Sequence, residues 1–174
     1  MIDSLASDEA AVYLDEVDIH LNPKISCDWM NRGKQKQLIT PGQNTKRYLC
    51  GALDNRSGQM TWVAGEKKNS LLFIETLRAL LRAYPQAKRI HVILDNFRIH
   101  DSKATRVAVG SLAGRIVLHF LPPYCPEENR IERVWLDLHA SVTRNHRCAA
   151  IEELINEVIC WLKTRNRRTA RQAA

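Results

Sequence analysis

The sequence predicts an α/β fold in which one mixed sheet carries helices on both faces. Three observations predict it. Apolar and polar residues alternate over positions 12–21, as in a half-buried strand. Two apolar segments at 48–53 and 60–64 are joined by a turn-rich link, which is typical of a hairpin. After the hairpin, segments with helical spacing alternate with short continuous apolar runs, which are typical of buried parallel strands.

Length and composition fit one globular domain. The chain has 174 residues, of which 45% are hydrophobic and 26% charged. The longest clear apolar run, residues 71–74, is far shorter than the roughly 18 residues of a membrane span. The acidic start does not resemble a secretory signal. The five cysteines are scattered without a C-x-x-C pair, so neither a zinc knuckle nor a disulfide framework is predicted. We expect a reducing compartment.

The formal net charge of +7 favours a polyanionic partner, of which nucleic acid is the commonest. A basic enzyme without such a partner fits this charge equally well. Charge alone therefore leaves both alternatives open.

The first half of the chain is predicted to hold the first strand, the hairpin and one helix. The strand over 12–21 ends where Asn22-Pro23 breaks it, and residues 24–46 form a basic loop. After the hairpin, Ser70 is expected to cap a helix that Pro85 ends. The apolar stripe of that helix has the spacing of Phe73, Leu77, Leu80 and Tyr84.

The second half is predicted to alternate short strands with helices. Buried strands are expected at 90–94 and 116–121, with a helix at 102–109 between them. A further helix is expected to open at Pro126, because proline is favoured at the first helical position. A last helix covers about 149–163. The basic residues 164–174 are expected to form a frayed tail, and residues 1–9 a polar lead-in.

Three acidic residues occur at positions where burial of a carboxylate would cost free energy. Asp15 lies at the end of an apolar strand segment, Asp95 follows the strand 90–94, and Glu132 follows a proline-stiffened loop. Sites gather at strand ends in sheets of this kind. Buried carboxylates need a partner or a cation, and converging ones repel each other. Divalent cations are the simplest compensation, and oxygen ligands suit Mg²⁺ or Mn²⁺.

Each acid also has an ordinary structural explanation. Asp95 fits a turn or a helix cap, Asp15 fits a solvated strand end, and Glu132 fits an intrahelical ion pair with a neighbour such as Arg133. The joint pattern, rather than any single acid, favours a cation site.

Several segments resemble one enzyme family. Asp15-Glu16, Asp95-Asn96 with His100, and the segment LPPYCPEENRIERVW at 121–135 resemble the catalytic domain of DDE transposases. The branch is the mariner-related bacterial insertion-sequence superfamily, whose members are DDE superfamily endonucleases. The loop segments Asn22-Pro23-Lys24, Trp29-Met30, Arg32-Gly33 and Thr40-Pro41-Gly42 are also similar to this branch. The resemblance covers roughly residues 10–163, which would form the DDE catalytic domain.

The resemblance implies a ribonuclease-H-like fold, DNA strand cleavage and strand transfer, and two Mg²⁺ or Mn²⁺ ions as cofactors. It implies that the catalytic residues and metal ligands are Asp15, Asp95 and Glu132. Accessory roles are predicted for Glu16, Asn96, His100, Glu128 and Asn129. Candidate contacts to DNA phosphates are Lys34, Lys36, Lys46, Arg47, Arg98, Arg130 and Arg133.

The sequence also departs from the family pattern. Cys125 stands where the family usually has serine, Glu128 where it has an apolar residue, and Arg130 where it has proline. A helix from Pro126 would put Glu128 and Glu132 one turn apart on one face, which makes Glu128 an alternative third carboxylate. The Asn-x-Ile-Glu-x-x-Trp frame favours Glu132.

Family members normally carry helix-turn-helix modules ahead of the catalytic domain, and only a short segment precedes the first predicted strand. We therefore expect a separately encoded second half, a truncated copy or an isolated catalytic part that needs a helix-turn-helix partner. The resemblance further implies double-stranded DNA as substrate (element ends and target), a homodimer on DNA, and a cytoplasmic, nucleoid-associated location without membrane contact. The alternatives are a nuclease that cleaves without joining and a non-catalytic fragment that binds nucleic acid or a partner.

Overall fold

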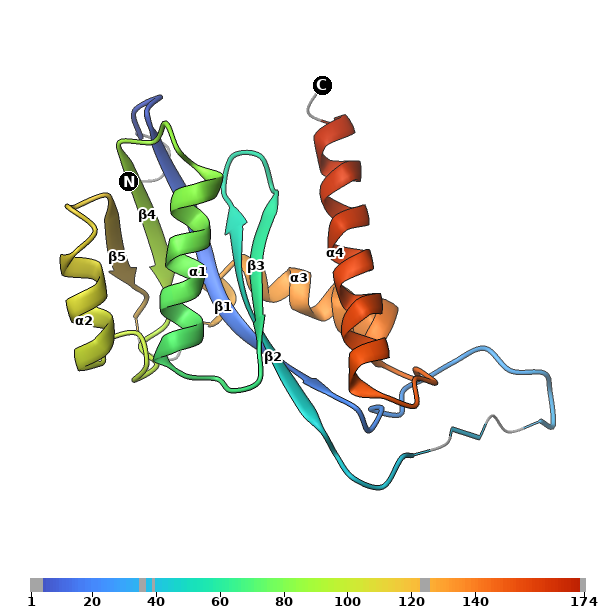
Figure 1. Ribbon diagram of the computed structural model, residues 1–174. Helices are drawn as coiled ribbons and strands as arrows, with labels where there is room; N and C mark the ends of the chain where they lie inside the picture. The colour runs from blue at the N-terminus through green and yellow to red at the C-terminus, as the bar shows by residue number, and fades with distance from the viewer. Residues whose placement is uncertain (1–4, 35–36, 39, 123–125, 173–174) are drawn as a thin grey trace.

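A mixed five-stranded sheet forms the centre of the computed structural model, which describes residues 5–34, 37–38, 40–122 and 126–172 (Figure 1). The strand order is β3-β2-β1-β4-β5, so the predicted mixed sheet is confirmed. The strands β1, β2 and β3 are antiparallel neighbours, whereas β4 and β5 continue the sheet in parallel with β1. The strand bounds are Glu9–His20 (β1), Lys46–Asp54 (β2), Met60–Gly65 (β3), Arg89–Leu94 (β4) and Ile116–Phe120 (β5).

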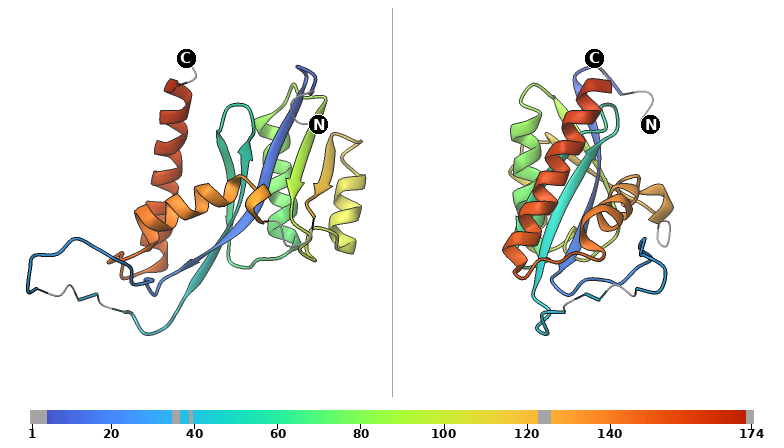
Figure 2. Two further views of the ribbon diagram at one scale, coloured as in Figure 1. Left: turned by 180° about the vertical axis from the view of Figure 1, so that it is seen from behind. Right: turned by 90° about the vertical axis from the view of Figure 1, so that its right-hand side faces the viewer.

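Helices cover both faces of the sheet, as predicted (Figures 1 and 2). The alternation along β1 divides the core in two. Leu14 packs in a cluster with Phe73 of α1, whereas Tyr13 packs in a second cluster with Ile131 of α3 and Leu162 of α4. The helix bounds are Ser70–Ala83 (α1), Lys103–Gly110 (α2), Ile131–Leu138 (α3) and Ile151–Gln172 (α4), with short helical turns at Pro126–Glu128 (η2) and His139–Thr143 (η3).

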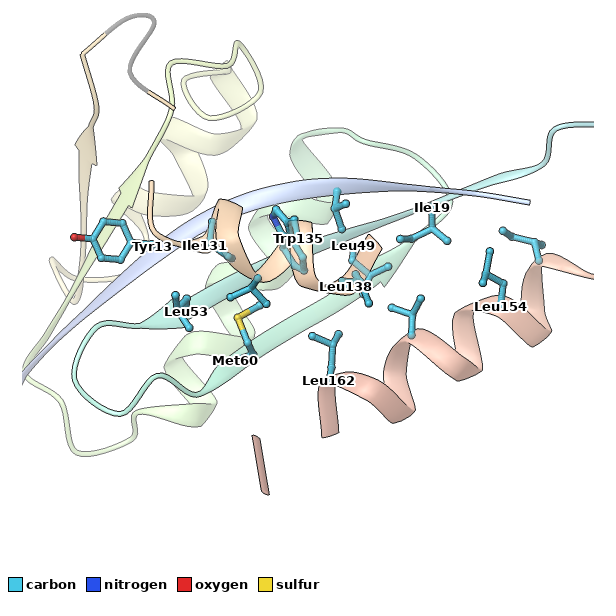
Figure 3. Packing of buried hydrophobic residues seen from close by; sticks show 14 of the residues in the cluster. Tyr13, Ile19, Leu49, Leu53, Met60, Ile131, Trp135, Leu138, Leu154 and Leu162 are labelled. Atoms are coloured by element: carbon cyan, nitrogen blue, oxygen red, sulfur yellow. The ribbon is translucent and has the colours of Figure 1, made fainter. Parts of the chain in front are cut away.

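The second cluster fixes α3 against the sheet (Figure 3). Ile131 and Leu138 of α3 are fully buried, and Trp135 between them is nearly so. They meet strand residues such as Leu49, and α4 closes the cluster with Leu154. Because α3 carries Glu132, this packing also fixes where that carboxylate lies relative to β1.

Asn69, rather than the predicted Ser70, caps α1. The Asn69 side-chain oxygen accepts a hydrogen bond from the Leu72 backbone N–H at 3.0 Å. The Ser70 hydroxyl instead donates to the Oγ of Ser102 at 2.8 Å, and Ser102 is the residue that caps α2. The prediction was wrong by one position because both residue types are good caps.

The predicted frayed tail is wrong for residues 164–172, because α4 continues to Gln172. Two side chains attach this part of the helix to the β2–β3 hairpin. Arg165 donates to the carbonyl of Gly58 at 2.7 Å. The Asn166 amide accepts from the Met60 backbone N–H and donates to the Met60 carbonyl, both at 2.8 Å. The charge of the segment suggested a solvated end, but these polar contacts give it a docking partner.

The predicted helix from Pro126 is also wrong. Residues 126–128 form a single 3₁₀ turn, and α3 begins only at Ile131. Glu128 and Glu132 therefore do not lie one turn apart on the same α-helix. Cys125, which departs from the family pattern, lies outside the described residues.

In the described part of the chain, no helix is both long and apolar enough to cross a membrane.

Candidate active site

Asp15 and Asp95 extend from neighbouring parallel strands. In the register of β1 and β4, Tyr13 lies opposite Ile93. Each acid stands two positions further along its own strand, and Asp95 directly follows the end of β4. Because neighbouring strands lie about 4.8 Å apart, the backbone brings these two positions to the same part of the sheet.

The Asp15 carboxylate is half-buried beside α3. Asp15 has the same parity along β1 as Tyr13, which packs against α3, and the Trp135 indole donates to Asp15 Oδ2 at 3.1 Å. Burial, together with the negative charges of Glu132 and Glu16, raises the pKa of Asp15 to about 7. The structure thus brings Asp15 and Glu132 close enough for their carboxylates to repel each other.

The Asp95 carboxylate is exposed but held in place. His100 Nδ1 lies 3.0 Å from Asp95 Oδ1, and the Phe97 backbone N–H donates to the same oxygen at 3.0 Å. The hydrogen bond to His100 is the main reason that the pKa of Asp95 lies below its usual value. Asp95 is therefore an ionised carboxylate with a fixed orientation.

A buried carboxylate supports His100 from the other side. Glu16 is on the opposite face of β1 from Asp15, and its Oε1 lies 3.1 Å from His100 Nε2. Both side chains are almost completely shielded from solvent. Burial lowers the pKa of His100, but the hydrogen bonds to Asp95 and Glu16 outweigh it and raise the pKa to about 9. Both ring nitrogens face oxygen acceptors, which is the arrangement of an imidazolium donor.

Lys68, which no sequence motif indicated, is a cation within this group of acids. Its Nζ lies 3.6 Å from Glu16 Oε2 and 4.9 Å from the centre of the Phe97 ring. Its charge lowers the pKa values of both Asp15 and Asp95. The residue precedes the cap of α1 in a charged turn, and only the fold shows that this turn faces the acids.

The remaining predicted accessory residues have structural contacts. The Asn96 amide donates to the Leu121 carbonyl and joins the ends of β4 and β5. The buried Asn129 amide donates to the Leu14 carbonyl at 3.2 Å. Glu128 is exposed on η2. Asn129 thus connects the segment before α3 to the strand residue next to Asp15.

The predicted DNA contacts are spread over several surfaces. Arg130 donates to Asn55 at 2.9 Å, and Arg47 forms an ion pair with Glu152 at 3.0 Å. Lys36 lies outside the described residues. Exposed side chains are found at Lys34, Lys46, Arg98 and Arg133.

The acids suit a hard divalent cation by their chemistry. Among the described residues, no group of three His, Cys, Asp or Glu side chains is arranged to hold a metal ion. Asp15 and Glu132 nevertheless present oxygen donors whose mutual repulsion a divalent cation would relieve. Asp95 adds an ionised oxygen donor on the neighbouring strand.

The family model described as DDE superfamily endonuclease matches residues 10–155 of this chain. The chain belongs to this family. The predicted resemblance is therefore confirmed. The chain is also 42% identical over 163 residues to the insertion element IS630 uncharacterized 39 kDa protein of Shigella sonnei. The match covers 94% of this chain and 47% of that protein, so the chain spans about half the length of its curated relative.

Solved structures of Mos1 mariner transposase share the fold. The Mos1 mariner paired-end complex with Mn aligns with a TM-score of 0.64 at 20% identity, over 88% of this chain and 48% of that one. The catalytic domain of Mos1 mariner transposase aligns with a TM-score of 0.57 at 18% identity, over 88% and 69% of the two chains. The predicted ribonuclease-H-like fold is thereby confirmed for this chain.

Proposed function

We propose that this chain is a transposase catalytic domain that cleaves DNA strands and joins them to a target. One observation carries the proposal. Asp15 and Glu132 approach each other beside α3, and Asp95 extends from the neighbouring strand at the same part of the sheet. Family membership supports it, because the matched family model describes endonucleases and the curated relative is named as an insertion-element protein.

We assign Asp15, Asp95 and Glu132 as the ligands of two Mg²⁺ or Mn²⁺ ions. The Mos1 mariner paired-end complex is known with Mn and with Mg, which supports divalent cations in a protein of this fold. When bound, such ions would neutralise charge on a phosphodiester and activate the oxygen nucleophile.

The protein's own side chains would orient the acids. The Trp135 indole holds Asp15 through its Oδ2, and His100 holds Asp95 through its Oδ1. Lys68 supplies a positive charge beside the acids and is 28% exposed, so its ammonium group can also reach an anionic substrate. Fixed orientation of this kind lowers the reorganisation that the reaction requires.

Double-stranded DNA is the proposed substrate, both as element ends and as target. Its backbone would meet cations such as Lys34, Lys46, Arg98 and Arg133, which the structure leaves exposed. We also propose that recognition of element ends needs a helix-turn-helix module and that two copies act together on DNA. The Mos1 structures with which the chain shares its fold include a paired-end complex with the left transposon end and a strand transfer complex, which supports assembly on DNA.

The test is nicking of supercoiled plasmid by the purified chain with Mg²⁺ or Mn²⁺. Asp95→Asn keeps the size of the side chain but removes its charge, and we expect cleavage to fall by at least about 100-fold, the scale of losing one electrostatic stabiliser. Asp101→Asn is the matched control, because Asp101 is exposed and pairs only with Arg106 among the described residues. Substantial activity in Asp95→Asn, or an equal loss in Asp101→Asn, would refute the assignment.

Two alternatives differ in their outcome. A nuclease of the same fold would nick plasmid but would not join a pre-cut end to target DNA. A non-catalytic fragment would bind without nicking, and the lack of a ready metal-binding group among the described residues is the observation that favours it. A strand-joining assay beside the nicking assay separates all three.

A further inference from the structure

The charges of α4 are segregated along the helix. Its acidic residues Glu152, Glu153 and Glu157 all lie in the first half. From there to Gln172 every charged residue is basic, and these residues are Lys163, Arg165, Arg167, Arg168 and Arg171. The second half of α4 is therefore a cationic segment on a regular helix.

Three of these cations form a stripe on the solvent face. Lys163, Arg167 and Arg171 follow one another at intervals of four residues and are exposed. None of the three has an ion-pair partner within the part of the chain that the structure describes. The side of the helix that faces the protein holds the fully buried Leu162, and Asn166 at its border contacts the β2–β3 hairpin. We call these three residues the cationic stripe.

The stripe is unfavourable for the isolated helix. Like charges at i,i+4 repel each other. The helix dipole favours cations only in the last turn, so it compensates Arg171 but not Lys163 or Arg167. A polyanion lying along this face would relieve the repulsion.

Contacts connect the stripe to the candidate active site. Arg165, on the docked side of α4, donates to Gly58 in the β2–β3 turn. Arg130 donates to Asn55 in the same turn and stands two positions before Glu132. The helices α3 and α4 also pack on the same face of the sheet, the face towards which Asp15 points. The stripe is thus held rigidly on the same side of the molecule as two of the three acids.

We propose that the cationic stripe binds the phosphate backbone of duplex DNA that extends beyond the cleavage site. This inference rests on the proposed function, because it takes DNA as the substrate. Successive stripe residues rise about 6 Å along the helix. That rise is close to two phosphates of one strand, at about 3.4 Å each along the duplex axis. Each cation can therefore meet a separate phosphate.

The experiment measures binding of the 174-residue chain to a fluorescent duplex without divalent metal, so that no cleavage occurs. Fluorescence anisotropy is followed between about 50 and 200 mM salt, the range over which phosphate contacts weaken steeply. The slope of log K against log salt is negative, and each lost phosphate contact reduces its magnitude by about 0.9. In the triple variant that combines Lys163→Gln, Arg167→Gln and Arg171→Gln, we expect the magnitude of this slope to fall by about 2.7. Binding at the lowest salt should weaken at least about tenfold.

The matched control is Arg82→Gln/Lys88→Gln/Lys103→Gln, which removes the same charge from exposed residues elsewhere. The control slope is expected to stay within about 0.5 of the wild type, since no phosphate contact is lost. A charge-retaining variant, Arg167→Lys/Arg171→Lys, should keep the wild-type slope. Circular dichroism should show all variants folded, with the stripe variant melting no lower than the wild type.

The possible failures are distinct. Equal slopes for the stripe variant and the wild type overturn the inference, as does an equal loss in the control, which would mean that only net charge matters. A wild-type chain that binds no duplex at low salt overturns it too. A stripe-dependent slope together with absent plasmid nicking keeps the inference and removes the proposed cleavage activity.

Discussion

Gly51 offers a sharp test of how β2 supports the candidate active site. It lies opposite Asp15 in the β1–β2 register. A Cβ at this position would stand 2.5 Å from Cη2 and 2.7 Å from Cζ2 of Trp135, and 2.9 Å from Cε of Met60. The Met60 methyl group can move, but the Trp135 indole is buried and hydrogen-bonded to Asp15. Gly51→Ala must therefore displace the ring that orients Asp15.

The expected loss of unfolding free energy in Gly51→Ala follows from overpacking of a dense core. An added methyl group that forces such a shift costs about 1–3 kcal/mol of unfolding free energy. For a domain of this size each kcal/mol lowers Tm by about 2–4 °C, so the expected drop is about 2–12 °C. Urea denaturation followed by circular dichroism measures the free energy, and a thermal scan measures Tm.

A double-mutant cycle with Trp135→Phe isolates the cause. Phenylalanine lacks the two ring atoms that a Cβ at Gly51 would strike, so Gly51→Ala should cost less than about 0.5 kcal/mol in that background, the scale of a substitution without a clash. The single Trp135→Phe variant is itself expected to lose stability through the space that it leaves. An equal cost of Gly51→Ala in both backgrounds would refute this explanation.

Two further predictions concern the docking of α4 and the acids. Asn166→Ala removes both hydrogen bonds to the β2–β3 hairpin and should lower the unfolding free energy by about 1–3 kcal/mol, because it leaves buried backbone groups unpaired. Urea denaturation measures this loss beside Arg168→Gln, a control at an exposed residue. Equal stability of the two variants would contradict the prediction. Mn²⁺ at about 100 times its Kd should raise the unfolding free energy of the wild-type chain by about 2.7 kcal/mol, and its Tm should rise accordingly. Asp15→Asn should abolish the stabilisation by Mn²⁺. Without metal at pH 8 the variant should be no less stable than the wild type, because it removes a buried charge that Glu132 repels. An undiminished Mn²⁺ effect in the variant would count against Asp15 as a ligand.

Patterns of neighbouring residues predicted most of the sheet. The alternation along β1 and the apolar run of β4 depend on which side chains meet the core, and that information is local. The same patterns placed Asp95 at a strand end correctly, but the predicted strand end at Asp15 is wrong, because β1 continues past it to His20. The parallel register of β1 and β4 brings the two positions together.

What the sequence could not predict depends on contacts between distant segments. Lys68 enters the group of acids only because the turn before α1 packs beside Glu16. The length of α4 depends on the hydrogen bonds between Asn166 and the β2–β3 hairpin. The charged residues around Asn166 give no sign of this contact in the sequence. The break before Ile131 was missed because a proline at a favoured helix start fits a 3₁₀ turn equally well.

The hydrogen bonds of Asn129 determine where the chain can tolerate inserted residues. Its side chain is tied to the Leu14 carbonyl, and its own carbonyl accepts from the Glu132 backbone N–H at 3.0 Å. One residue thus clamps the start of α3 directly to β1. Inserted residues upstream of this clamp would leave the acids where they are, whereas a single insertion between Asn129 and Glu132 would rotate the glutamate away from Asp15.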